Sequence, residues 1–427
     1  MKVLLLSHGP ITTYQNMGKT FLSLLSTFQK EELCHLYIYP AIPDADLCCS
    51  QYRITDQDIL RSYFHFGKVR GREILSSEID PEKHEKYESQ QAKQLYSRKK
   101  NYKTILARDF MWQFAWFMTE DLKAWLTREK PTCILLAPGE ARFIYRMALK
   151  IASFLRIPLM VYVCDEFFFI DPPDSMLGKL QLRLLKKTIR KTLKASSGAV
   201  TICDSLNRQY SGYFGIPCHT IMTGTSFPIG EEIHCCADPR SITYMGNLAF
   251  HRYRSIGDIG RALDRINGKK GTDYCLNLYT PAWDDEIRQE FSGIRSIRYC
   301  GYVTGQAYRE AFQSAEILLH TEGFDEKSRE RVRNSVSTKI ADSLGSGIPL
   351  FAYGPEGIAS MEHLKACGGA VLCENPEELD QKLTELFENC DLRSEKAENG
   401  LKAALKYHQS EVSSRNLHRI LSQLKGS

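Results

Sequence analysis

The sequence predicts an α/β protein with two doubly wound domains in tandem. The chain has 427 residues, which is longer than a single hydrophobic core usually serves. Short and nearly continuous apolar runs alternate with helical patterns, as expected for strands buried on both faces of a parallel sheet. The series is interrupted by TSFPIGEEIHCCADPR (225–240), a segment of Pro, Gly and charge that is typical of a linker.

The apolar runs define the expected strands in order. In the first half they are KVLLLS (2–7), HLYIYPAI (35–42), TCILLA (132–137), LMVYVC (159–164), GAVTIC (198–203) and HTIMT (219–223). In the second half they are ITYMGN (242–247), YCLNLYT (274–280), IRYCGY (297–302), AEILLHT (315–321), PLFAYG (349–354) and AVLCE (370–374). We therefore expect an N-terminal domain at 1–228 and a C-terminal domain at 229–404.

Two segments depart from this alternation. Residues from about 45 to 105 form a polar insertion, and its charge-rich part PEKHEKYESQQAKQLYSRKK is predicted to be helical. The last segment, 405–427, places apolar residues on one side of a helix: Val412, Leu417, Ile420, Leu421 and Leu424. This spacing predicts an amphipathic helix that packs across the domains.

Composition excludes several classes of protein. With 43% hydrophobic and 25% charged residues the chain is typical of a soluble globular protein, and its net charge of +5 argues against general nucleic-acid binding. The 14 cysteines contain no C-x-x-C pair, which favours a reducing compartment over disulfide or zinc chemistry. No segment approaches the roughly 20 apolar residues of a membrane span, and MKVLLLSHGP is too short for a signal peptide. We expect a cytoplasmic protein.

The stretch VSTKIADSLGSGIPLFAYGP (336–355) predicts a helix with an unusual start. Ser337 and Thr338 are capping residues, and Gly345 or Gly347 ends the helix. Lys339 then lies at the positive end of the helix dipole, which costs about 0.3–1 kcal/mol unless an anion is nearby. Hydroxyls, free N–H groups and a cation suit phosphate, and Asp342 would accept hydrogen bonds from a ribose. The alternative is a surface helix on which Lys339 and Asp342 pair with each other.

The pattern S-x-K-x-x-D-x-L-x-x-G-x-P-L-F, preceded by A-E-I-L-L-H-T-E-G-F, resembles the donor half of GT-B glycosyltransferases. The likeness is greatest to bacterial transferases akin to glycosyltransferase family 4 that build surface polysaccharides. It covers most of the chain, weakly at 45–105 and more specifically at 240–375. It implies two Rossmann-like domains that face each other across a cleft.

The resemblance also implies roles for individual residues. In Y-M-G-N-L-A-F-H-R-Y-R, Gly246 would let the backbone approach the donor, and Arg252 would stand where the family has a pyrophosphate-binding lysine. In Y-C-G-Y-V, Tyr302 would lie near the base. Glu322 of T-E-G-F resembles the first of the family's paired glutamates, which meets the transferred sugar. Asp342 resembles the second, the ribose ligand.

The sequence departs from the family at this site. Asn247 replaces an arginine, so Arg252 or Arg254 must carry more of the phosphate charge. The paired glutamates are usually eight residues apart, whereas Asp342 follows Glu322 by 20 residues. The intervening DEKSRERVRNSVSTK is expected to form a basic loop over the donor. With this altered spacing, Glu322 has a second interpretation as a polar residue that closes a strand.

Two residues of the N-terminal half are candidates for the acceptor side. N-M-G-K-T lacks the P-loop spacing, because the required first glycine would be Thr13. Gly18 instead resembles the glycine loop of the transferase N-domain that faces donor phosphates and acceptor, or it is a plain turn glycine. Asp165, after a strand, would orient the acceptor hydroxyl or act as its base, or it caps the following turn. The family often has His-Asp here, but Cys164 replaces the histidine.

Two polar patterns have competing interpretations. The triplets Asp44-Ala45-Asp46 and Asp56-Gln57-Asp58 resemble metal-binding D-x-D motifs of the other main transferase fold, yet they lie in the irregular insertion, and we expect no metal. KLQLRLLKKTIRKTLK (179–194) has seven basic residues, no acid, and an apolar stripe at Leu182, Leu185, Ile189 and Leu193. Such a helix lies on an anionic membrane surface, or it buries its stripe in the core and leaves its lysines in water.

The sequence therefore predicts a glycosyltransferase of the GT-B fold. It would move a sugar, as a retaining hexosyltransferase, from a nucleotide diphosphate to a glycan or lipid-linked glycan, without a metal and without nucleic acid. The predicted catalytic residues are Lys339, Arg252 and Asp165, and the donor-binding residues are Gly18, Gly246, Asn247, Tyr302, Glu322, Ser337, Thr338 and Asp342. The alternatives are a nucleotide-sugar epimerase of the same architecture and a non-catalytic relative that acts as a scaffold.

Overall fold

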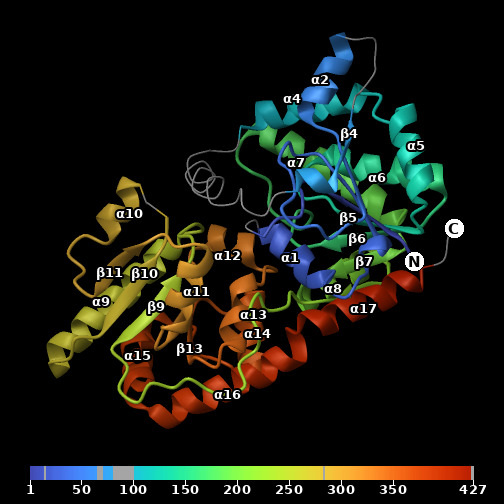
Figure 1. The fold of residues 1–427 in the computed structure, drawn as a ribbon. Helices are drawn as coiled ribbons and strands as arrows, with labels where there is room; N and C mark the ends of the chain where they lie inside the picture. The colour runs from blue at the N-terminus through green and yellow to red at the C-terminus, as the bar shows by residue number, and fades with distance from the viewer. Residues whose placement is uncertain (14–15, 65–70, 80–100, 282–283, 425–427) are drawn as a thin grey trace. The chain divides into compact units, whose positions relative to one another are not determined.

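The computed structural model describes residues 1–13, 16–64, 71–79, 101–281 and 284–424. The chain folds into two compact units, which are drawn in Figure 1. The first comprises Met1–Thr223 with Ser410–Ser427, and the second comprises Gly224–Gln409. Each unit contains a sheet covered by helices, as predicted for a doubly wound α/β protein.

The first unit is built on a sheet of eight described strands in the order β4-β3-β2-β1-β5-β6-β7-β8. Neighbouring strands are parallel except β3 and β4, which are antiparallel. The strands are β1 (Val3–Ser7), β2 (Leu33–Tyr37), β3 (Ser50–Arg53), β4 (Arg72–Ile74), β5 (Cys133–Ala137), β6 (Leu159–Val163), β7 (Gly198–Thr201) and β8 (Cys218–Thr220). β1, β2, β5 and β6 are buried along their whole length, which explains their continuous apolar sequences.

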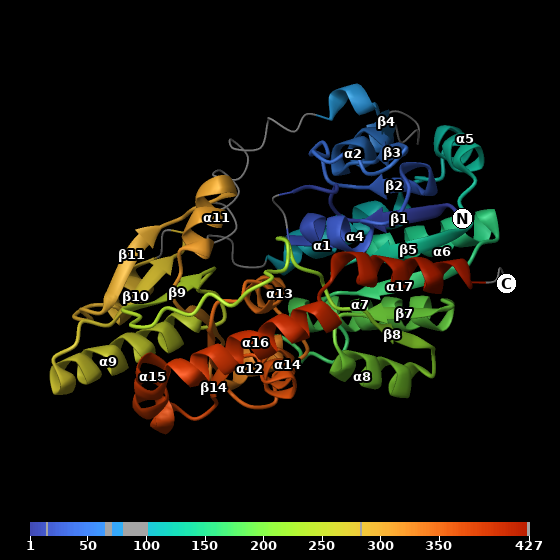
Figure 2. The same ribbon diagram turned by 60° about the horizontal axis from the view of Figure 1, so that its bottom comes forward.

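The described helices of this unit are α1 (Asn16–Leu24), α2 (Asp56–Phe64), α4 (Tyr102–Phe114), α5 (Glu120–Glu129), α6 (Arg142–Leu155), α7 (Met176–Lys194), α8 (Asp204–Phe214) and α17 (Ser410–Ser422), with 3₁₀ turns η1 (Lys30–Glu32) and η2 (Ser76–Glu78). α17 packs against α1, from the opposite end of the chain (Figure 2). Ser414 Oγ accepts a hydrogen bond from Thr27 N at 3.0 Å, and His418 Nε2 lies 3.0 Å from Glu32 Oε1. The C-terminal helix therefore completes the first unit.

The second unit has a parallel sheet of six described strands in the order β11-β10-β9-β12-β13-β14. They are β9 (Ser241–Met245), β10 (Cys275–Tyr279), β11 (Ile297–Gly301), β12 (Leu318–Thr321), β13 (Leu350–Tyr353) and β14 (Val371–Cys373). This is the strand order of a dinucleotide-binding Rossmann sheet. The direction of winding reverses between β9 and β12, which defines a topological switch point.

Helices cover both faces of this sheet. They are α9 (Arg252–Lys270), α10 (Asp285–Glu290), α11 (Gly305–Gln313), α12 (Glu326–Val332), α13 (Thr338–Gly345), α14 (Ala359–Cys367), α15 (Leu379–Glu388) and α16 (Cys390–Tyr407), with the turn η4 (Pro376–Glu378). One apolar cluster joins the strands to α9 and α15, and another joins them to α11, α13, α14 and α16. Figure 2 shows α9 and α11 on opposite faces of β9–β11.

Each of the twelve predicted apolar runs overlaps a strand, but the polar insertion differs from the prediction. β3 and β4 form there, with the short polar sequences SQYR and REI at the edge of the sheet, and α2 lies between them. The segment that we predicted to be helical, 81–100, lies outside the described residues.

The segment expected to be a linker is attached to the second unit. Gly230 N donates to Gly345 O at 2.8 Å, and His234 N donates to Gly347 O at 2.8 Å. The buried Arg393 guanidinium donates to Cys236 O and to Ala237 O, both at 3.0 Å. These bonds explain why the second unit begins at Gly224, ahead of the expected boundary at 229.

The apolar stripe of α7 is part of the core of the first unit. Leu182, Leu185, Ile189 and Leu193 are at most 4% exposed, so they are not available for a lipid surface. Of the two interpretations of this helix, the structure has the one in which packing against the unit's own core buries the stripe. Among the described residues, no helix has both the length and the apolar character needed to cross a bilayer.

Candidate nucleotide-binding site

Gly246, Asn247 and Glu322, three of the predicted donor residues, lie at the topological switch point of the second unit. Gly246 and Asn247 follow β9, and Glu322 follows β12, the neighbouring strand. The carboxyl ends of parallel strands meet at one edge of the sheet, and ligands of such folds bind where the strand order reverses. Fold topology therefore brings together residues that lie more than 70 positions apart in the chain.

Arg252 and Glu322 form a buried ion pair at this edge. Arg252 is the first residue of α9, and its Nε and Nη2 atoms donate to Glu322 Oε2 at 2.9 Å and Oε1 at 3.1 Å. The two side chains are 15% and 3% exposed. Burial raises the pKa of the Glu322 carboxyl, whereas Arg252 and Lys339 oppose that shift. Arg252 Nη1 also donates to Asn247 Oδ1 at 3.1 Å.

Lys339 reaches across the end of β9. A Cβ atom placed on Gly246 would lie 2.5 Å from Lys339 Nζ, so the missing side chain leaves room for the ammonium group. The turn is held by Tyr244, whose hydroxyl donates to Asn247 O at 2.6 Å. Lys339 lies in the first turn of α13, after Ser337 and Thr338 as expected. The Ser337 hydroxyl makes no capping hydrogen bond, contrary to the predicted cap.

A histidine that sequence reasoning missed lies beside this pair. His320 is on β12, two residues before Glu322 and thus on the same side of the strand. Its Nε2 atom is 3.6 Å from Glu322 Oε1, and it is buried without a hydrogen-bond partner. Burial, Arg252 and Lys339 lower the pKa of His320 to about 3. His320 stands two residues before Glu322 in H-T-E-G-F, which could have pointed to the site, but a histidine in an apolar strand resembles a core residue.

Asp342 belongs to a second cluster further along α13. It is buried, and its Oδ1 atom accepts a hydrogen bond from Ser226 N at 2.5 Å. Burial raises the pKa of the Tyr308 hydroxyl, and the nearby Asp342 and Tyr302 raise it further. Phe227 stacks on Tyr308 with ring centroids 6.1 Å apart. Tyr308 and Phe227 are thus aromatic neighbours of Asp342 that the motifs did not single out, and Tyr302 is half exposed.

The residues between Glu322 and Asp342 are not the expected loop. They contain α12, whose N-cap Asp325 accepts from Ser328 N. Asp325 Oδ2 also lies 2.7 Å from His251 Nδ1, beside Arg252. The unusual spacing of the two carboxylates therefore reflects an inserted helix, capped and attached next to the ion pair.

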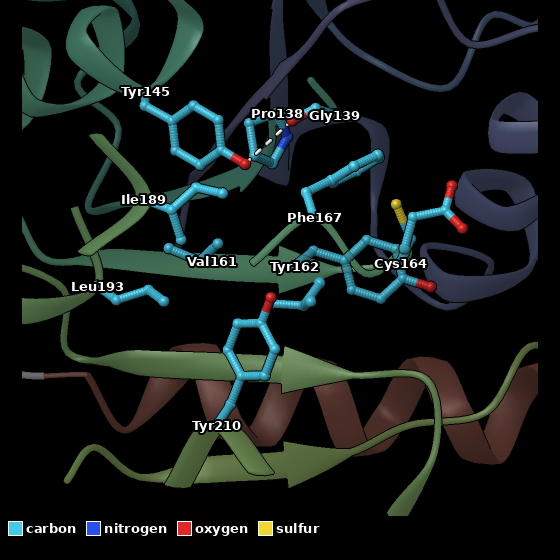
Figure 3. Close-up of a pocket in the computed structure, with 12 residues that line it drawn as sticks. Pro138, Gly139, Tyr145, Val161, Tyr162, Cys164, Phe167, Ile189, Leu193 and Tyr210 are labelled. Carbon is cyan, nitrogen blue, oxygen red and sulfur yellow. Dashed lines mark hydrogen bonds between the residues drawn. The ribbon is translucent and has the colours of Figure 1, made fainter. Parts of the chain in front are cut away.

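Gly18 and Asp165 lie in the first unit. Gly18 is buried in α1, and a Cβ atom there would lie 1.9 Å from Thr12 O, so a close backbone approach requires this glycine. Asp165 is exposed after β6. It lines a small apolar cavity of about 20 Å³, with room for roughly one water molecule. Tyr145 and Tyr210 approach this cavity from opposite sides (Figure 3), and it is too small for a sugar.

The carboxylates of the two D-x-D triplets have other partners. Asp44 accepts hydrogen bonds from Thr13 N and Oγ1, and Asp46 pairs with Lys30. Asp56 accepts from Arg108 and from the Trp112 indole. Asp58 accepts from Thr55 at the start of α2. These contacts give the triplets structural roles in the first unit.

The sequence of residues 257–419 matches a family model described as glycosyl transferase-like. No curated protein sequence matches the chain. Among solved structures, Anabaena HepE in complex with UDP is similar, with a TM-score of 0.62 and 11% identity, and the match covers 99% of this chain and 100% of that one. An α,α-trehalose-phosphate synthase (UDP-forming) from Burkholderia vietnamiensis has a TM-score of 0.61 at 11% identity, with the same coverage. The lipopolysaccharide outer core galactosyltransferase WaaB has a TM-score of 0.57 at 11% identity, again with the same coverage.

These findings confirm the predicted fold and the resemblance to GT-B glycosyltransferases. Residues 257–419 thus resemble a glycosyl transferase-like domain, and the solved structures show the fold of the whole chain. They do not distinguish family 4 from other families with this fold, and they do not favour a nucleotide-sugar epimerase.

Proposed function

We propose that the protein transfers a hexose from a nucleotide diphosphate sugar to a glycan or lipid-linked glycan, and that UDP is the nucleotide. The observation that carries this proposal is the meeting of Arg252, Lys339 and Gly246 at the switch point of the second sheet. Two cations beside a glycine suit a diphosphate, which needs both charge and close backbone approach. UDP is favoured because HepE is described in complex with UDP and the trehalose-phosphate synthases as UDP-forming.

The proposed mechanism is electrostatic. Negative charge builds on the diphosphate as the sugar–oxygen bond breaks, and Arg252 and Lys339 stabilise that charge in a partly buried site. In this proposal Glu322 lies beside the transferred sugar and Asp342 accepts hydrogen bonds from the ribose. The two side-chain cations supply the charge that a divalent metal would otherwise supply, so the reaction needs no metal. Retention of configuration is proposed from the family resemblance.

For the acceptor side we propose a site near Gly18 and Asp165 and a location on the cytoplasmic face of an anionic membrane. The outer side of α7 supports the location, because its exposed residues include the apolar Met176, Leu177 and Leu180 and the basic Lys179, Arg183, Lys187, Arg190, Lys191 and Lys194. The neighbouring α4 exposes Phe110 and Phe114 at 67% and 64%, and Trp116 follows it at 69%. Exposed aromatic and apolar side chains next to cations are typical of proteins that bind at a lipid interface.

Sedimentation with vesicles tests the location. The protein should sediment with phosphatidylglycerol vesicles and less with phosphatidylcholine vesicles, and Phe110→Ser with Phe114→Ser should reduce that binding. Tyr407→Ser is the control, since Tyr407 is an exposed aromatic residue of the second unit. Equal sedimentation of the double variant and the wild type would refute a lipid-binding role for α4.

Thermal shift with UDP, GDP, ADP, CMP and dTDP tests the donor site. A ligand at 100 times its dissociation constant adds about 2.7 kcal/mol of stability. UDP should stabilise the wild type, and Lys339→Ala should lose that response. Lys402→Ala is the matched control, because Lys402 is an exposed lysine of the same unit that pairs with Glu398. If no diphosphate stabilises the wild type at millimolar concentration, the donor site is refuted and the scaffold alternative takes its place.

A further inference from the structure

His320 is a buried histidine whose side-chain Nε2 atom makes no hydrogen bond. It is 9% exposed and lies on β12, between β9 and β13 in the sheet. Its Nε2 atom has no hydrogen-bond partner, and Glu322 Oε1 lies 3.6 Å away, beyond the 2.7–3.2 Å of ordinary N–H···O bonds. Buried polar groups are nearly always satisfied, so an exception requires an explanation.

The surroundings of His320 point to Glu322 as its partner in another state of the site. Both Glu322 oxygens are occupied by Arg252 in this structure, at 2.9 Å and 3.1 Å. Arg252 is also the residue that the proposed function assigns to the donor diphosphate. A guanidinium that turns toward a diphosphate gives up part of its contact with Glu322. The buried carboxylate then requires another donor.

We propose that His320 is a positioning residue that holds Glu322 when a diphosphate draws Arg252 away. This inference rests on the proposed function, because it requires a diphosphate at Arg252. In the diphosphate-bound state, the Nε2–H group donates to Glu322 Oε1 after a shift of several tenths of an ångström. No other hydrogen bond of His320 opposes this shift. The exchange keeps Glu322 in place beside the transferred sugar.

The charge state of His320 suits this role. Burial and the two neighbouring cations keep the imidazole neutral, as its lowered pKa indicates. A neutral donor satisfies Glu322 without adding a third positive charge next to Arg252 and Lys339. It also leaves the negative charge of Glu322 unneutralised, available to the sugar.

The test compares two variants of similar length. His320→Gln keeps an N–H donor near the Nε2 position, whereas His320→Met removes the donor. UDP and UMP are the probes, because only UDP carries the β-phosphate that would draw Arg252 away. We expect His320→Met to weaken UDP binding and to lower kcat, each by about 10- to 100-fold, as for loss of a hydrogen bond to a charged group. UMP binding should change less than threefold, and His320→Gln should restore most of the UDP affinity.

A measurement on the unaltered protein supports the comparison. In ¹⁵N-histidine spectra, the Nε2 resonance of His320 should shift when UDP is added and stay in place when UMP is added. The inference is overturned if that resonance does not respond to bound UDP, or if His320→Met binds UDP as the wild type does. It is also overturned if His320→Gln is impaired as much as His320→Met. In each of these cases wild-type UDP binding stands, whereas a wild type that binds no diphosphate overturns the proposed function as well.

Discussion

Removal of Arg252 should destabilise the second unit and make its stability depend on pH. Arg252→Met keeps much of the side-chain volume but leaves the Glu322 carboxylate, 3% exposed, without its bidentate partner. Breaking a buried pair in this way costs about 3–5 kcal/mol. Because Lys339 still stabilises the negative charge of Glu322, we expect the lower end of that range, about 3 kcal/mol at pH 8. The double variant with Glu322→Gln removes the unpaired charge and should recover about 2 kcal/mol.

The pH dependence follows from the direction of the Glu322 shift. Burial raises its folded-state pKa above the ordinary value of 4.5, and loss of Arg252 raises that pKa further. The folded state then binds a proton more tightly than the unfolded state, so stability falls as pH rises from about 4.5 through the folded pKa. Above that pKa the stability is constant. Arg252→Met should therefore be more stable at pH 5.5 than at pH 8, and the double variant should not share that difference.

Urea-dependent hydrogen exchange measures the free energy of unfolding of each unit separately. Peptides from β12 and β13 report the second unit, and peptides from β1 and β5 serve as internal controls from the first. Rates at the two pH values are corrected for intrinsic exchange. If Arg252→Met costs less than about 1 kcal/mol, or if Glu322→Gln does not rescue it, the two residues do not form a buried ion pair.

Three further predictions test other parts of the structure. Gly18→Ala should destabilise the first unit by about 1–3 kcal/mol in a thermal melt, because its Cβ would lie 1.9 Å from Thr12 O. Gly212→Ala is the control, since Gly212 in α8 has open space around it, and this substitution should be neutral or stabilising. Arg393→Met should lower the free energy of unfolding by at least about 2 kcal/mol, because the carbonyls of four residues lose a buried hydrogen-bond donor: Leu386, Phe387, Cys236 and Ala237. Hydrogen exchange in the 235–237 segment should also become faster. Unchanged exchange there would contradict the anchoring role of Arg393. Transfer activity should survive dialysis against EDTA, because in the proposed mechanism Arg252 and Lys339 supply the positive charge at the diphosphate. Loss of activity that Mg²⁺ or Mn²⁺ restores would contradict a metal-independent reaction.

The strands were predictable because their burial follows directly from their sequences. A run such as Val3–Ser7 has no polar face, and only a sheet covered on both sides accommodates it. β3 and β4 escaped prediction because the short polar sequences SQYR and REI carry no such signal. The relation of the 225–240 segment to the second unit was also hidden, because it depends on backbone bonds to Gly345 and Gly347.

The site was predictable only as a set of residue types. Motifs pointed to Arg252, Glu322 and Lys339, but the pairing of Arg252 with Glu322 joins positions 70 residues apart and appears only when β9 and β12 become neighbours. For Gly18, the motif pointed to a functional role where the structure shows a packing role. Its motif suggested a ligand loop, whereas the contact that requires a glycine there is with the carbonyl of Thr12.

The Arg252–Glu322 pair also explains why the two interpretations of Glu322 were hard to separate. In this structure Glu322 occupies the donors of Arg252 that a diphosphate would use, so the carboxylate takes the place of the ligand's negative charge. In the absence of the nucleotide sugar, the carboxylate of Glu322 keeps the buried guanidinium of Arg252 paired with a negative charge. This pairing lowers the affinity for the nucleotide, because a bound diphosphate must compete with Glu322 for Arg252. Nucleotide affinity should therefore rise in Glu322→Gln, while transfer falls, because the residue that competes with the phosphates is also the one proposed to meet the sugar.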